Sequence, residues 1–176
     1  MGTIKTTNIE PIADNGTVTL GSSGDTFTLA SGVTQTIANN TPAFYVYKNA
    51  VQAVANNTET VVTWPVERFD TDSAFASNTF TVPSGEGGKY LFNAGIRWDA
   101  SADFEAIRIS IRKNGASFSS CWGRNEYYNT QQITSILDLS ATDTVDIVGK
   151  QSYGSSVNIG SADQGDISWF QGFKLT

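Results

Sequence analysis

The stretch Asn78-Thr79-Phe80-Thr81-Val82-Pro83, followed shortly by Gly88-Lys89-Tyr90-Leu91-Phe92, indicates what kind of fold the chain adopts. Both runs contain aromatic and β-branched residues, and proline and glycine separate them, which is typical of two β-strands joined by a turn. Comparable runs recur along the chain without a long helical period between them. We expect strands at residues 43–48, 61–64, 78–82, 89–99, 104–112, 132–139, 144–150 and 168–175.

The run from Phe104 to Arg112 has the clearest alternation of apolar and polar residues. Three isoleucines alternate there with Arg108, Ser110 and Arg112, which predicts a strand with one buried face. Lys113-Asn114-Gly115 follows directly and predicts a tight hairpin turn. Eight or more strands at this spacing predict an all-β protein built as a two-sheet sandwich or jelly roll.

From Pro42 to Thr176 the order of these landmarks resembles the C1q/TNF superfamily. The similarity is strongest in the phenylalanine strand around Phe80, its proline–glycine turn and the strand that begins at Gly88. One departure is Thr142, where the family usually has glycine. The other matching motifs are Arg112-Lys113-Asn114-Gly115, Leu137-Asp138-Leu139, Asp143-Thr144-Val145 and Trp169-Phe170-Gln171-Gly172-Phe173-Lys174-Leu175.

This resemblance implies a C1q/TNF-like jelly roll over residues 39–176 that assembles as a homotrimer. In the family the closing strand lies near the trimer axis, and Gly172 would let the backbone pack closely there. Aromatic and aliphatic side chains of the matching motifs are expected to fill the core or the trimer interface. These residues are Phe44, Tyr90, Phe92, Phe170, Phe173 and Leu175.

Residues 1–38 differ from the rest, being rich in Thr, Ser and Gly and carrying a short internal repeat. Residues 17–22 (TVTLGS) are echoed by residues 26–31 (TFTLAS), with Ser23-Gly24-Asp25 as the turn between them. An isolated hairpin is marginal in water, so three such arms would wind about one axis and bury Val18, Leu20, Phe27 and Leu29. The alternative is a flexible tail. Asn39-Asn40-Thr41-Pro42 marks the domain boundary.

The arm also resembles N-terminal segments of structural proteins of tailed bacteriophages. This resemblance implies a virion protein whose arm binds capsid or tail proteins while the trimer projects from the particle surface. We expect a capsid decoration (cement) protein or a short fibre. The alternatives are a tail-fibre knob that binds a host surface glycan or protein, and a free C1q-like lectin.

Charge and hydropathy exclude several kinds of partner. Eleven Lys and Arg against 17 Asp and Glu give a net charge of −6, which argues against nucleic-acid binding. The chain begins without the apolar run of a signal peptide, and no stretch has the length and hydropathy of a membrane helix, so we expect no membrane partner. Cys121 is the single cysteine, which rules out an intrachain disulfide.

The chain contains no histidine, which removes the commonest general base and metal ligand. We therefore expect neither an enzyme nor a cofactor. A glycosidase would need a carboxylate pair such as Asp70 with Asp72 or Asp99 with Asp103, but carboxylates in loops are usually solvated or cap backbone groups. The same acids, with Asp163 and Asp166, leave calcium binding open but without support, because no EF-type loop orders them.

The segment from Ser120 to Asn129 has the composition of a recognition site, since Tyr, Trp, Arg and Asn favour receptor and glycan contacts. Its candidate ligand contacts are Trp122, Arg124, Tyr127 and Tyr128. The alternative is that these aromatic residues fill the core or the trimer interface. Cys121, with no histidine to activate it, is expected to be an unreactive buried thiol.

Overall fold

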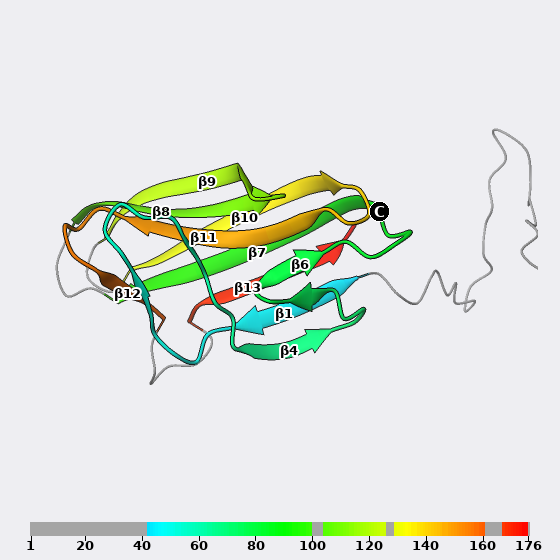
Figure 1. Cartoon of the computed structure of the whole chain (residues 1–176), viewed down its shortest axis with the longest axis horizontal. Coiled ribbons are helices and arrows are strands. Elements are labelled where there is room, and N and C mark those ends of the chain that lie inside the picture. The colour runs from blue at the N-terminus through cyan, green and yellow to red at the C-terminus, as the bar shows by residue number, and fades with distance from the viewer. Residues whose placement is uncertain (1–41, 100–103, 126–128, 161–166, 176) are drawn as a thin grey trace, which may run out of the picture. The chain divides into compact units, whose positions relative to one another are not determined.

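A computed structural model describes residues 42–99, 104–125, 129–160 and 167–175. These residues form two β-sheets packed face to face (Figure 1). None of the described residues lies in a helix long and apolar enough to cross a membrane. The strands are β1 (Ala43–Tyr47), β2 (Gln52–Val54), β3 (Thr60–Val61), β4 (Val66–Asp70), β5 (Phe75–Ala76), β6 (Thr79–Thr81), β7 (Gly88–Asp99), β8 (Phe104–Lys113), β9 (Ala116–Asn125), β10 (Thr130–Leu139), β11 (Thr144–Gln151), β12 (Val157–Ile159) and β13 (Trp169–Lys174).

Strands distant in sequence lie side by side in both sheets. The first, here called the β7 sheet, has seven strands in the order β2-β12-β7-β13-β1-β4, with β10 pairing on β7. The second, the β8 sheet, has six in the order β5-β6-β11-β8-β9, with β3 pairing on β11. The named strands pair antiparallel, and β13 is inserted between β1 and β7. This antiparallel two-sheet arrangement, with crossovers between strands, is that of a jelly roll.

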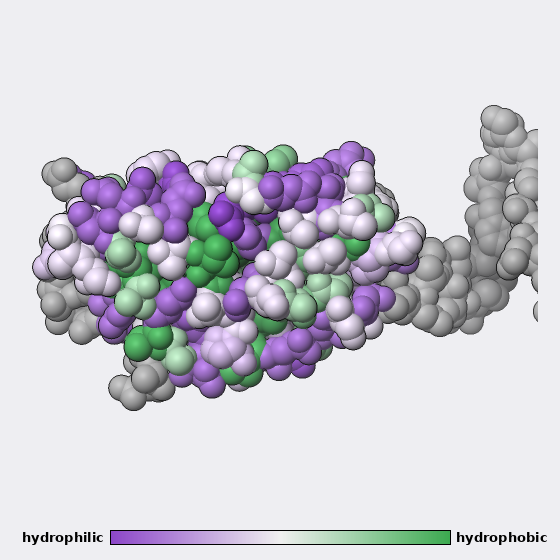
Figure 2. Space-filling view, in the orientation of Figure 1, coloured by the Kyte–Doolittle hydropathy of each residue, from purple (hydrophilic) through white to green (hydrophobic). Residues whose placement is uncertain are grey.

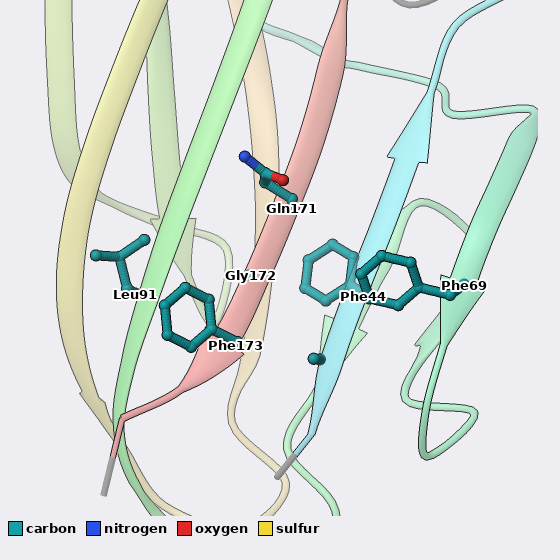
Figure 3. Close-up of a pocket in the computed structure, with 7 residues that line it drawn as sticks. Phe44, Phe69, Leu91, Gln171, Gly172 and Phe173 are labelled. Atoms are coloured by element: carbon teal, nitrogen blue, oxygen red, sulfur yellow. The ribbon is translucent and has the colours of Figure 1, made fainter.

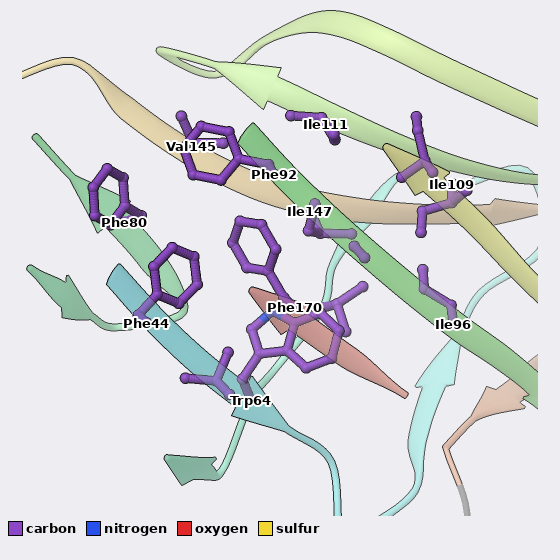
Figure 4. Close-up of a cluster of buried hydrophobic side chains, with 14 of the residues drawn as sticks. Phe44, Trp64, Phe80, Phe92, Ile96, Ile109, Ile111, Val145, Ile147 and Phe170 are labelled. Carbon is purple, nitrogen blue, oxygen red and sulfur yellow. The ribbon is translucent and has the colours of Figure 1, made fainter. Parts of the chain in front are cut away.

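The core lies between the sheets because alternate residues of each strand point inward. On β7 the even-numbered residues from Tyr90 to Trp98 are buried, and on β8 the three predicted isoleucines meet them from the other sheet (Figure 4). Val145 and Ile147 of β11 complete the same layer. Burial of side chains of this size contributes roughly 1.5–3 kcal/mol each.

Aromatic rings fill one end of this core. The ring of Phe44 stacks on Phe75 and Phe80, with centroid distances of 4.9 and 5.1 Å, and meets Phe170 edge-on at 4.9 Å. Phe92 packs against the same group, 5.6 Å from Phe80. Such pairs add about 0.5–1.5 kcal/mol each beyond the burial of their area. The sequence landmarks that carry the family resemblance therefore meet in one cluster.

The predicted hairpin turn is confirmed, but the strand after it was not predicted. Asn114 and Gly115 both have positive φ, 51° and 77°, as a two-residue type I′ turn requires. The chain then returns as β9, a ten-residue strand. Its many serines hide the strand in the sequence, because they lack the alternation of apolar residues that marks β8.

Four further strands, β2, β4, β5 and β12, are also missing from the sequence prediction. Each has only two to five residues, too short for a hydrophobic period to be recognised. The run expected at 61–64 is reduced to β3, Thr60–Val61. The arm of residues 1–38, with Val18, Leu20, Phe27 and Leu29, and the boundary at residues 39–41 lie outside the described residues and stay predictions.

Candidate interaction surfaces

The outer face of the β7 sheet carries an apolar row across four strands. Ala43 of β1 pairs with Phe173 of β13, which pairs with Leu91 of β7, which pairs with Ile136 of β10. These side chains point away from the core, and Phe173 and Ile136 are 45% and 55% exposed. Large apolar groups are therefore aligned on a surface with no described residue over them, as at a protein–protein interface.

The next row of the same face is partly polar and tightly hydrogen-bonded. Asn93 Nδ2 donates to Thr134 Oγ1 at 2.7 Å, and its Oδ1 accepts from Trp169 Nε1 at 2.6 Å. The indole of Trp169 lies over Gly95, where a Cβ would come within 2.6 Å of the ring. The polar groups of this row are thus paired with each other.

A pocket of about 270 Å³ interrupts the apolar row (Figure 3). Phe173 of β13 and Phe69 of β4 stand on its two sides, and Phe69 is 48% exposed. Ala43 is too small to fill the space between them, and Leu91 and Gln171 complete the lining. The hollow is the size of a large side chain, so it can receive one from a partner.

A second exposed group lies on the outer face of the β8 sheet. Trp122 of β9 is 60% exposed and pairs in register with Arg108 of β8, whose guanidinium carbon lies 5.1 Å from the indole centroid. The same guanidinium forms an ion pair with Glu59. On the face drawn in Figure 2, hydrophilic residues surround separate hydrophobic patches.

Comparison with known proteins identifies the fold. No family model matches the chain, and no curated protein matches its sequence. Among solved structures, the globular domain of zebrafish complement 1qA protein is 18% identical with a TM-score of 0.52, and the match covers 77% of this chain and 98% of that one. Murine APRIL at pH 5.0 is 11% identical with a TM-score of 0.58, covering 77% and 100% of the two chains. Eiger TNF from S. frugiperda is 15% identical with a TM-score of 0.50, covering 77% and 92%.

The fold is a C1q/TNF-like jelly roll. The resemblance inferred from the sequence is confirmed at this level, since these matches cover 77% of the chain. At identities of 11–18% the similarity extends to the fold alone.

The jelly roll divides the six predicted packing residues into two groups. Phe44, Tyr90, Phe92 and Phe170 are fully buried in the core. Phe173 and Leu175 are exposed, so of the two expected places, core or trimer interface, they do not occupy the core. The reason is the two-residue period of a strand: a residue three positions after inward-facing Phe170 faces outward. Packing in a trimer remains the prediction for both.

The predicted ligand contacts are only partly described. Trp122 and Arg124 lie on β9 and are exposed, so Trp122 does not fill the core. Tyr127 and Tyr128 lie outside the described residues. The sequence prediction missed Arg108 and Glu59, which lie 49 positions apart. The alternation of polar and apolar residues in β8 indicated that Arg108 faces outward. No sequence pattern indicated that it pairs with Glu59.

The remaining candidates form no reactive site among the described residues. Cys121 is a half-buried free thiol that packs against the core. Asp70 Oδ2 accepts the Phe75 N–H at 2.7 Å, and Asp72 Oδ2 accepts the Thr71 hydroxyl at 2.7 Å, so both carboxylates bind local turn groups. No group of three or more potential metal ligands occurs within the described ranges. Asp103, Asp163 and Asp166 lie outside these ranges, and calcium binding stays untested.

Lys48 and Asp143 are among the titratable groups whose pKa is shifted by their surroundings. Burial lowers the pKa of Lys48 to about 8, although its Nζ donates to Thr63 O at 2.9 Å and to Gln52 Oε1 at 3.2 Å. Hydrogen bonds from Asn114 and then Lys113 lower the pKa of Asp143 to about 2. Both groups join separate segments of the chain, and neither lines the pocket beside Phe173, so we assign them structural roles.

Proposed function

We propose that the chain is a non-enzymatic interaction module that assembles as a homotrimer through the outer face of its β7 sheet. The observation that carries the proposal is the apolar row in which Phe173 and Ile136 are about half exposed. Contiguous apolar surface of this kind marks association sites in soluble proteins. Closed rings of identical subunits bury such a face without leaving an open edge.

The two sheets differ in their outer faces, which supports this choice of surface. On the β8 sheet the outward positions include Ser110 and Ser120, whose hydroxyls lie 2.7 Å apart, and Arg112, which is paired with Asp146. These polar side chains are paired with one another, and Ser110 is itself fully buried, so they present little apolar surface to a partner. The row on the β7 sheet has no comparable charge, and its pocket beside Phe173 can receive a side chain of a second copy. The closing strand's resemblance to the strand near the trimer axis of the C1q/TNF superfamily favours three copies.

The test is the substitution Phe173→Glu, measured by the native mass of the full chain. A carboxylate at the centre of the apolar row would be buried without a partner in the trimer, so we expect dissociation to monomers. The matched control is Val51→Glu, which alters an exposed residue between β1 and β2, outside the row, and should leave the mass unchanged. Circular dichroism verifies that both variants fold. A folded Phe173→Glu variant with the wild-type mass would exclude this face as the interface.

We further propose that the trimer is a virion surface protein, acting as capsid decoration or as a short fibre. Its support is the resemblance of residues 1–38 to N-terminal segments of tailed-phage structural proteins. In this scheme the arm binds capsid or tail proteins and the jelly roll projects outward.

Particle binding tests the virion proposal. Full-length protein and protein lacking residues 1–38 are each mixed with particles that lack the protein, and the particles are then sedimented. We expect only the full-length protein to sediment with them. If the truncated protein binds equally well, the arm is not the attachment element, and if neither binds, the virion role is excluded.

Trp122 favours a second candidate, a knob that recognises a host surface glycan or protein. A large exposed aromatic side chain that is held in place by a neighbouring guanidinium is typical of binding hot spots. The same feature would serve a free C1q-like lectin. A particle-bound trimer and a ligand-binding trimer are compatible, because the arm, the β7 sheet and the outer face of the β8 sheet are different parts of the chain.

A further inference from the structure

We propose that Trp122, Arg108 and Glu59 form a binding platform for a pyranose ring of a carbohydrate. The proposal specifies the ligand class of the outer face of the β8 sheet. It depends neither on the virion role nor on the trimer interface, because the three residues lie on strands or loops of the other sheet.

The three side chains form a connected group in which Arg108 holds the other two. Its guanidinium stacks on the indole of Trp122 and pairs with the carboxylate of Glu59. The Arg108 side chain is only 13% exposed, whereas that of Glu59 is 45% exposed. Arg108 therefore fixes the orientation of its two neighbours, and the groups presented to solvent are an indole and a carboxylate.

An ordered, exposed indole contributes less to folding stability than a buried one would, which indicates a role other than folding. Leaving a large aromatic side chain mostly in water forgoes much of the free energy that its burial would contribute. The cation–π contact with Arg108 keeps the ring in one position, so a ligand that stacks on it loses little conformational entropy in binding. This pre-organisation distinguishes Trp122 from Phe118, another exposed aromatic residue of β9 for which no aromatic or cation–π contact occurs among the described residues.

The dimensions of the platform favour a sugar over a protein partner. Stable protein–protein interfaces bury about 1,200–2,000 Å² with an apolar centre. Next to Trp122 and Arg108 in the register come Ser120 and Ser110, whose hydroxyls are hydrogen-bonded to each other, so the apolar area is one side chain wide. A pyranose ring matches it: its C–H face stacks on the indole, and its hydroxyls donate to the carboxylate of Glu59.

Lys150 extends the platform on the side of β11. It pairs in register with Arg108, and no ion pair to another described residue involves it. A sugar that carries a carboxylate can therefore bind as well as a neutral one. Neutral and carboxylate-bearing saccharides share the pyranose ring. The salt dependence of binding distinguishes them, because a charge-assisted contact weakens as ionic strength rises.

The experiment is a glycan array probed with the full-length protein, followed by titration of the strongest neutral and carboxylate-bearing saccharides. Binding is monitored by isothermal titration calorimetry, because Trp122→Ala removes the most exposed tryptophan of the described residues and with it the main fluorescence reporter. We expect saccharide binding by the wild type, and affinity weakened by about tenfold or more in Trp122→Ala and in Glu59→Gln. Phe118→Ala, on the same strand, is the matched control and should bind like the wild type.

Three results would overturn the platform. The first is a wild-type protein that binds no saccharide on the array. The second is equal loss of binding in Trp122→Ala and Phe118→Ala. The third is a Trp122→Ala variant that binds sugar normally but has a lower native mass, which would place Trp122 at a subunit interface. Native mass is measured on every sample, so failure of the platform is distinguishable from failure of the trimer.

Discussion

At the scale of single residues, Gly172 sets how closely β13 packs on the core. A Cβ at this position would lie 2.5 Å from Cδ1 of Phe92 and 3.0 Å from Cε1 of Phe44. Both rings are buried and held by other rings, so neither can move away freely. The glycine thus lets the aromatic cluster extend beneath the strand that carries Phe173 on its outer side.

We expect Gly172→Ala to lower the free energy of unfolding by about 1–3 kcal/mol, because overpacking a rigid core forces side chains off their rotamers. Chemical denaturation at fixed protein concentration measures the change. Gly123→Ala is the matched control: its Cβ would lie 3.3 Å from Gln131 Nε2 and no closer than 3.7 Å to Ile107, so the effect should be smaller. Equal effects of the two substitutions would contradict this explanation.

Lys48 makes the stability depend on pH in the alkaline range. Burial lowers its pKa to about 8 in the folded chain, while the unfolded chain keeps the ordinary value of 10.5. The folded state therefore loses its proton first, and stability rises with pH between these two values. Tyr90 acts in the opposite direction at higher pH: burial raises its pKa to about 12, so its contribution is lost as pH rises from about 10 to about 12.

We expect the wild type to become more stable between about pH 8 and pH 10, and Lys48→Met to lack this rise. Denaturant midpoints at half-unit pH intervals measure it. The chosen interval lies below the range in which Tyr90 reduces stability. A wild-type midpoint that is constant or falls over the interval would show that the ammonium group is not penalised by burial.

At the scale of elements, Asp143 joins two turns at one end of the β8 sheet. Its Oδ1 accepts from Asn114 Nδ2 at 2.7 Å, and its Oδ2 accepts from the Ser140 N–H at 2.8 Å. Lys113 Nζ lies 2.8 Å from the same Oδ2. The turn between β8 and β9 is therefore fixed to the turn that precedes β11.

These contacts lower the pKa of Asp143 to about 2, against 3.8 in the unfolded chain. Their stabilising effect is complete above about pH 4 and is lost as the pH falls through about 2. We expect Asp143→Asn to be less stable than the wild type at neutral pH, with the difference narrowing in that acidic range. Thermal unfolding across pH checks this, with the exposed Asp138→Asn of β10 as control. A pH-independent difference would show that the charge is not responsible.

The sequence predicted the elements with a clear period and missed those that depend on distant partners. The isoleucines of β8 and the Asn114-Gly115 turn carry local signals, so both were found. The serine-rich β9 has no apolar period, because it is an edge strand with few core positions. Phe173 was expected inside or at an interface, and only the register of β13 decides that it faces outward.

The candidate platform could be predicted only in part, for a related reason. Trp122 and Arg124 stand out by residue type, but the ion pair between Arg108 and Glu59 forms because β3 pairs with β11, which pairs with β8. No local pattern encodes a contact made through two successive strand pairings. Residue chemistry therefore found the aromatic group, and the fold supplied the charged groups beside it.

At the scale of the whole molecule, the central claim is that the outer face of the β7 sheet, and not the arm, holds the subunits together. The most direct measurement is the native mass, by light scattering at two dilutions, of the full chain and of a chain lacking residues 1–38. We expect both to have three times their chain mass, which for the full chain is a multiple of 18.9 kDa. A truncated chain that is monomeric at both dilutions would contradict the claim, and a full chain that is also monomeric would exclude the trimer altogether.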